Sequence, residues 1–115
     1  MTDVMRGSLA DERSAPETGE RVDTLVRLRN LSIAHVLGRI VAPTAYLQTE
    51  DEFALVLEGE ATLDLLGERI ELAPGDWVLL PAGVPHHVIT SEPGTSWLTV
   101  KLGPVSPASG DVPTS

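Results

Sequence analysis

The chain of 115 residues contains no cysteine, only 3% aromatic residues, and 8 Lys and Arg against 17 Asp and Glu. The absence of cysteine excludes disulfides, thiolate metal ligands and cysteine nucleophiles, and it fits a cytoplasmic protein. A net charge of -9 leaves no basic patch that could neutralise phosphates. Nucleic acid is therefore not an expected partner, whereas a neutral or positively charged small ligand is compatible with this charge.

Long apolar runs are also missing. No segment approaches the roughly 20 apolar residues that span a bilayer, and the first 30 residues have no continuous apolar core of an export signal. We therefore expect a soluble, cytoplasmic protein without a membrane partner. The sequence also has no Gly-x-Ser-x-Gly elbow and no glycine-rich phosphate loop before a helix, which excludes the corresponding nucleophile and nucleotide sites.

The length of the chain predicts one domain with one core. Residues 1–20 are polar and interrupted by Gly and Pro, and residues 104–115 are rich in Gly, Pro and Ser, so both are predicted to be flexible. Between them, residues 21–103 alternate short apolar runs with turns every eight to twelve residues. This pattern predicts an all-β fold, an antiparallel double-sheet barrel, with strands near 21–28, 31–41, 52–60, 61–66, 69–72, 77–80, 88–90 and 97–102.

Some of these runs, FALVL and WVLL among them, are apolar on both faces. A sheet with one solvated face would alternate more regularly between apolar and polar residues. Two packed sheets, one of them covered by a further subunit, account for the continuous runs. We therefore expect a homodimer.

The stretch from Gly75 to His87, GDWVLLPAGVPHH, holds a short buried strand between two turns and presents adjacent histidines. The spacing of Gly75, Pro81, Gly83 and His86 resembles the second motif of the cupin superfamily. Upstream, Glu52 and Gly59 resemble the end of the first cupin motif, and the 15 residues between Gly59 and Gly75 fall in the usual range. This resemblance, to small single-domain cupins of the cupin-2 type, implies a jelly-roll-like barrel over residues 25–102.

The first motif departs from the pattern of metal-binding cupins, in which two histidines precede the glutamate. Tyr46 and Gln48 stand at those positions here. The resemblance therefore implies either no cofactor or one divalent transition metal (Fe, Mn, Zn or Ni) at a weakened site of Glu52, His86 and Gln48, since amide and phenol oxygens are poorer ligands. His35 would strengthen the site if it faced inward; the alternative for His35 is a structural strand histidine.

The residues themselves also suggest a small-molecule site. Alternation places Val88 and Thr90 on the side of His86, and Ala54 and Val56 on the side of Glu52, so small apolar residues would surround these two polar groups. The candidate ligand-binding residues are Tyr46, Gln48, Glu52, His86 and His35, with His86 and Tyr46 as candidate catalytic acid-base groups. In one alternative, these polar side chains only hydrogen-bond one another inside a filled barrel. In another, Glu52 belongs to a solvated acidic loop and not to a site. By the same alternation His87 faces the surface, and Trp77 and Trp97 are core or interface residues.

Three functions remain open at this point. The first is a cupin that binds a small polar organic ligand in its barrel without requiring metal. The second is a metal-dependent cupin enzyme, an oxygenase, isomerase, cyclase or lyase, which uses His86, Glu52 and Tyr46. The third is a structural or regulatory dimer with a closed barrel.

Overall fold

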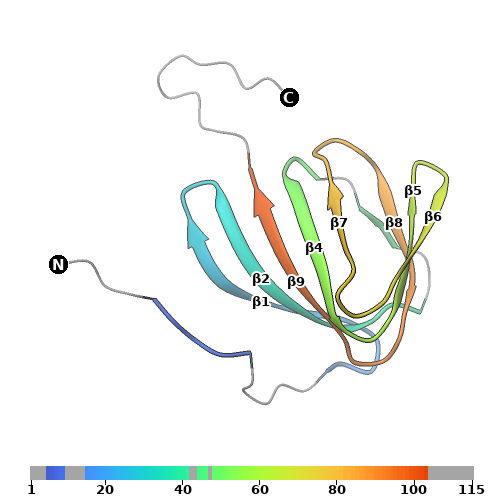
Figure 1. The fold of residues 1–115 in the computed structure, drawn as a ribbon, viewed down its shortest axis with the longest axis horizontal. Coiled ribbons are helices and arrows are strands. Elements are labelled where there is room, and N and C mark those ends of the chain that lie inside the picture. The colour runs from blue at the N-terminus through green and yellow to red at the C-terminus, as the bar shows by residue number, and fades with distance from the viewer. Residues whose placement is uncertain (1–4, 10–14, 42–43, 47, 104–115) are drawn as a thin grey trace.

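The structure, a computed structural model, describes residues 5–9, 15–41, 44–46 and 48–103. These residues form two antiparallel β-sheets, which confirms the predicted all-β double-sheet fold (Figure 1). Among them there is no helix long and apolar enough to cross a membrane. The strands are β1 (Gly19–Leu28), β2 (Leu31–Arg39), β3 (Thr44–Tyr46), β4 (Asp51–Glu58), β5 (Ala61–Leu65), β6 (Glu68–Leu72), β7 (Trp77–Leu80), β8 (His86–Ser91) and β9 (Thr95–Leu102).

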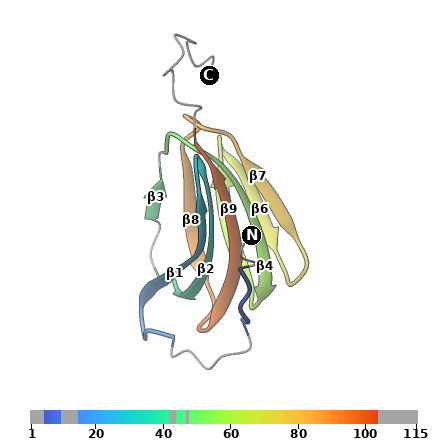
Figure 2. The same cartoon turned by 90° about the vertical axis from the view of Figure 1, so that its left-hand side faces the viewer.

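The larger sheet has the order β1-β2-β9-β4-β7, and the smaller sheet has the order β3-β8-β5-β6. Figure 1 shows the five strands of the larger sheet side by side from β1 to β7. Figure 2 shows β3 at the margin of the molecule beside β8, its partner in the smaller sheet. The C-terminal strand β9 is thus central in the larger sheet, between β2 and β4.

The core lies between the two sheets, on the inner face of the larger one. Trp97 in β9 is opposite Val36 in β2 and Val56 in β4, and it is only 6% exposed. The buried cluster also contains residues of the smaller sheet, so it joins the two layers; its members are Ala54, Val56, Ala61, Leu63, Leu72 and Trp97. Branched aliphatic side chains therefore supply most of the packing, as the composition predicts.

The described strands contain three β-bulges, at Leu25 in β1, Leu57 in β4 and Ile89 in β8, and those in β1 and β8 change which of the candidate residues face inward. Leu25 is an extra residue in β1, because Thr24 is opposite Ala34 while Val26 is opposite Ile33. Ile89 is an extra residue in β8 in the same sense, between Val88 and Thr90. A bulge of one residue reverses the alternation of every side chain beyond it on that strand.

The outer face of the larger sheet is largely apolar. One cross-strand row on this face consists of Ile33, Val100, Phe53 and Leu79. The rings of Phe53 and Trp77 contact each other at a centroid distance of 5.5 Å. Trp77 is nevertheless 62% exposed and Leu79 55% exposed, so the chain by itself leaves part of this face open to water.

The turn of the β1-β2 hairpin is tied to the end of β9. The side-chain amide of Asn30 donates to the carbonyl of Gly103 at 2.8 Å, and the backbone N–H of Gly103 donates to the carbonyl of Asn30 at 2.7 Å. Two reciprocal hydrogen bonds therefore hold this turn beside the last described residue of the chain.

Candidate functional site

A cavity of about 330 Å³ lies between the two sheets. Three of the residues predicted from the sequence, Gln48, Glu52 and His86, line it together. Ala54 and Val88 also line it, as predicted from strand alternation. Thr90 does not: it is exposed and lines a separate depression with Arg39 and Glu92, because the bulge at Ile89 reverses the alternation beyond Val88. The prediction for Thr90 was wrong for this reason.

Gln48 and Glu52 form one hydrogen-bonded pair. The side-chain amide of Gln48 donates to Oε1 of Glu52 at 2.8 Å and also approaches the carbonyl of Glu50 at 3.4 Å. Glu52 is the second residue of β4 and is half-buried, so it belongs to a strand and not to a solvated loop. The pair presents a carboxylate and an amide to the same cavity.

The loop before β8 is fastened to the segment that carries this pair. The backbone N–H of Gly83 donates to the carbonyl of Gln48 at 2.9 Å, and that of Ala82 donates to Oδ1 of Asp51 at 2.8 Å. Gly83 has a φ of 76°, a conformation that glycine adopts without steric cost. The two motifs of the sequence thus hold each other, and together they fix the start of β8.

His86 is the first residue of β8 and is only 3% exposed. Its backbone is opposite Tyr46 in β3 on one side and Leu65 in β5 on the other. The side chain of Tyr46 lies outside what the structure describes. The adjacent His87 is exposed to solvent.

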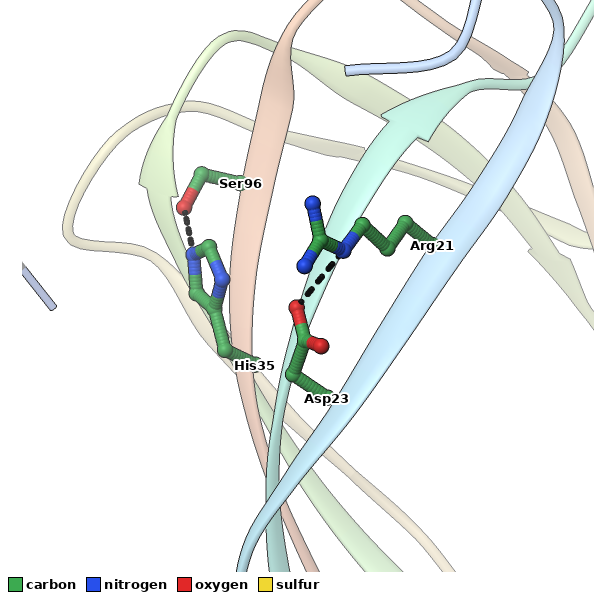
Figure 3. Close-up of polar contacts among 4 residues, drawn as sticks. All are labelled: Arg21, Asp23, His35 and Ser96. Carbon is green, nitrogen blue, oxygen red and sulfur yellow. Dashed lines mark hydrogen bonds and ion pairs between the residues drawn. The ribbon is translucent and has the colours of Figure 1, made fainter. Parts of the chain in front are cut away.

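His35 is not among the residues that line the cavity. Its neighbours in β2, Ser32, Ala34 and Val36, line the cavity, so His35 lies on the outer face of the larger sheet. There its Nε2 is 2.6 Å from the hydroxyl of Ser96, and both residues are buried (Figure 3). Asp23 is opposite His35 in β1 and forms an ion pair with Arg21 at 3.1 Å. The structure therefore separates His35 from Gln48, Glu52 and His86.

Several cavity residues were not predicted from the sequence. Arg27, Ser32 and Lys101 line the entrance, and Trp97 lines the interior. The buried Nε1 of Trp97 has no hydrogen-bond acceptor among the described residues. Arg27 was missed because its inward position depends on the bulge at Leu25, for which the sequence gives no evident signal.

The described residues do not fit a metal ion. They contain no group of three or more His, Asp or Glu side chains placed to hold one. Glu52, a predicted ligand, instead accepts a hydrogen bond from Gln48. What the arrangement offers chemically is a set of hydrogen-bonding and charged side chains around a small cavity, with a buried imidazole among them.

Comparisons with known proteins agree with this architecture. A solved structure of a proposed mannose-6-phosphate isomerase from Ralstonia eutropha JMP134 superposes with a TM-score of 0.77 and 26% identity, over 85% of this chain and 97% of that chain. A conserved protein of unknown function from Streptococcus pyogenes superposes with a TM-score of 0.69 and 20% identity, over 92% of this chain and 98% of that chain. A cupin superfamily protein from Desulfitobacterium hafniense DCB-2 superposes with a TM-score of 0.63 and 21% identity, over 79% of this chain and 84% of that chain.

A search of curated proteins found no match. The family described as Cupin domain, Cupin_2, matches residues 38–101, which is more than half of the chain and includes Gln48, Glu52 and His86. The chain therefore belongs to the Cupin_2 family and is a small single-domain cupin.

Proposed function

We propose that this cupin binds a small polar organic ligand in the cavity between its sheets and does not require a metal ion to do so. The observation that carries the proposal is that Gln48, Glu52 and His86, from three separate positions in the sequence, line one cavity of about 330 Å³. This volume is within the usual range for small-molecule sites. The third hypothesis, a closed barrel, is disfavoured because a closed barrel would have no such space.

The polar groups suit a ligand with hydroxyl or amine groups. The carboxylate of Glu52 accepts hydrogen bonds, and the amide of Gln48 supplies both a donor and an acceptor. Burial of His86 excludes water from its ring, so a ligand contact there would not compete with bulk solvent. Tyr46 would join the site through its phenol, on the strength of its position opposite His86 in the register of β3 and β8.

A second candidate is an enzyme in which His86 and Tyr46 move a proton. It is favoured by the Ralstonia eutropha protein, 26% identical, which is described as a proposed isomerase. The metal-dependent form of this candidate has less support, because the described residues offer no metal-binding group. Conversion of a bound ligand, followed by NMR, would separate an enzyme from a binding protein.

We also propose that the protein is a homodimer that covers the outer face of the larger sheet. The exposed Trp77 and Leu79, together with Phe53, support this arrangement. Because the face lies opposite the cavity side of the same strands, dimerisation would leave the ligand site accessible.

The replacement His86→Ala is expected to abolish ligand binding while the fold stays intact, because the imidazole lines the cavity at a strand end. Binding would be measured by thermal shift against a panel of small polar metabolites, and folding by far-ultraviolet circular dichroism. His87→Ala is the matched control, since the adjacent ring is exposed. Loss of folding in His86→Ala, with the control unchanged, would make His86 structural. One equivalent of a transition metal per subunit in the purified protein would instead favour the metal-dependent enzyme.

A further inference from the structure

We propose that the ligand is a small organic anion, with a carboxylate or phosphate held by Arg27 and Lys101 and a hydroxyl or ammonium group held by Glu52. This inference rests on the proposed function and specifies the class of ligand. It starts from the arrangement of charged residues at the cavity entrance.

Four polar side chains form one continuous row across the larger sheet. Arg27 in β1 is opposite Ser32 in β2, Ser32 is opposite Lys101 in β9, and Lys101 is opposite Glu52 in β4. All four line the cavity. Directly opposed residues on neighbouring strands have Cβ atoms about 4.5–5.5 Å apart. Arg27 and Lys101 are therefore separated by a single strand, which brings two cationic groups within reach of one small anion.

These two cations are not neutralised by the protein. Neither Arg27 nor Lys101 forms a side-chain hydrogen bond or an ion pair in the part of the chain that the structure describes. The whole sequence has only 8 basic residues against 17 acidic ones, and Lys101 is its one lysine. Exposed arginines such as Arg29 and Arg69 are unpaired in the described residues as well, so the missing partner alone does not set these two cations apart. What favours an anionic ligand is that Arg27 and Lys101 line the same cavity and are separated by a single strand.

The backbone is adapted to place Arg27 there. Glu20, Val22 and Thr24 line the cavity from the even positions of β1, so strict alternation would turn Arg27 outward. The extra residue Leu25 reverses the alternation, and Arg27 then faces the cavity. Bulges are commonly found where a strand must redirect a functional side chain.

Next to Lys101 the cavity lining carries carboxylates and an amide. Gln48 and Glu50 line the cavity just before β4, and Glu52 lines it from β4 itself, directly opposite Lys101 on the neighbouring strand. An anion alone would be repelled by these carboxylates. An anion that also carries a hydroxyl or ammonium group could bind the two cations through its anionic group and the carboxylates through the other group. The entrance thus matches hydroxy acids, amino acids or phosphorylated alcohols, and the cavity volume of about 330 Å³ suits molecules of metabolite size.

The test compares pairs of compounds that differ mainly in the anionic group. D-gluconate is paired with D-glucitol, L-malate with 1,2,4-butanetriol, and glycerol 3-phosphate with glycerol. Dissociation constants would be measured by NMR titration at millimolar concentrations. We expect at least one acid to bind about tenfold or more tightly than its neutral partner, because charge-assisted hydrogen bonds are the stronger ones. The first two pairs test a carboxylate and the third tests a phosphate.

Variants assign this preference to the two side chains. Arg27→Gln and Lys101→Gln are each expected to weaken binding of the acid about tenfold and to leave the neutral partner nearly unchanged. Arg69→Gln is the matched control, because Arg69 is exposed on β6 and does not line the cavity. An unchanged affinity for the acid in both cavity variants would overturn the proposal.

The single lysine permits a second readout. Trinitrobenzenesulfonate reacts with amines, and a bound acid is expected to slow the modification of Lys101 while the terminal amine reacts as before. If only neutral ligands bind, and they depend on His86 but not on Arg27, the proposed function stands and the anion inference falls. If neither acids nor neutral polar compounds bind, both fall.

Discussion

Gly59 and Gly67 share a left-handed backbone but have different surroundings. Their φ angles are 80° and 84°. A Cβ atom on Gly67 would meet nothing within 4 Å, whereas one on Gly59 would lie 2.5 Å from Oγ1 of Thr95. Thr95 is fully buried, and its hydroxyl donates to the carbonyl of Glu92 at 2.7 Å, so it cannot move aside. The turn after the first motif therefore requires glycine for two separate reasons.

We expect Gly67→Ala to lower the free energy of unfolding by about 1–2 kcal/mol, the usual cost of a side chain in this backbone region. Gly59→Ala is expected to cost about 1–3 kcal/mol more, because the methyl group is also forced against Thr95. Urea denaturation of both variants measures the difference directly. Equal losses would mean that the chain around Thr95 relaxes without cost.

At the scale of elements, most strands and the two motifs could be predicted, but the strand β3 and the side-chain orientation beyond a bulge could not. The motif spacing in the sequence singled out Gln48, Glu52 and His86, which line one cavity; that they bind a ligand stays a prediction. Arg27 was not recognised and Thr90 was misplaced, because the sequence gives no evident signal for the bulges at Leu25 and Ile89. His35 was left open in the sequence analysis, since alternation alone does not say which face is inward.

The bulge in β1 makes a specific prediction about deletions. Deleting Leu25 is expected to keep the pairing of Arg27 with Ser32, because the extra residue is removed and a regular strand remains. Deleting Leu25 and Val26 together is expected to turn Arg27 outward and weaken binding of the organic acid about tenfold. NMR titration of both deletion variants checks this, with circular dichroism to confirm folding. Loss of acid binding in the single deletion would argue against the role of the bulge.

At the scale of the whole molecule, a single chain leaves part of the apolar outer face of the larger sheet exposed to water. The cross-strand row of Ile33, Val100, Phe53 and Leu79 runs from β2 across β9 and β4 to β7, where Trp77 and Leu79 are more than half exposed. Contiguous apolar patches of this kind usually mark an interaction surface. A second copy of the chain on this face would cover the outer side of strands such as β7, whose inner side already faces the other sheet, and would account for their continuous apolar sequences.

If the proposed dimer forms through this face, Trp77→Asp is expected to convert it to a monomer by placing a charge in the apolar surface, with a dissociation constant raised roughly thirtyfold or more. Sedimentation velocity at micromolar concentration measures the change. Leu66→Asp is the matched control, since Leu66 is 76% exposed in the hairpin turn of the other sheet. A wild-type protein that sediments as a monomer would contradict the arrangement.

The hydrogen bonds between Asn30 and Gly103 also determine where the rest of the polypeptide leaves the domain. Gly103 follows Lys101 by only two positions, so whatever is attached beyond it departs next to the row of Arg27, Ser32 and Lys101. The first strand starts at the far end of the sheet, where Gly19 is opposite Arg39. A fluorophore fused after Gly103 would therefore sense occupancy of the entrance.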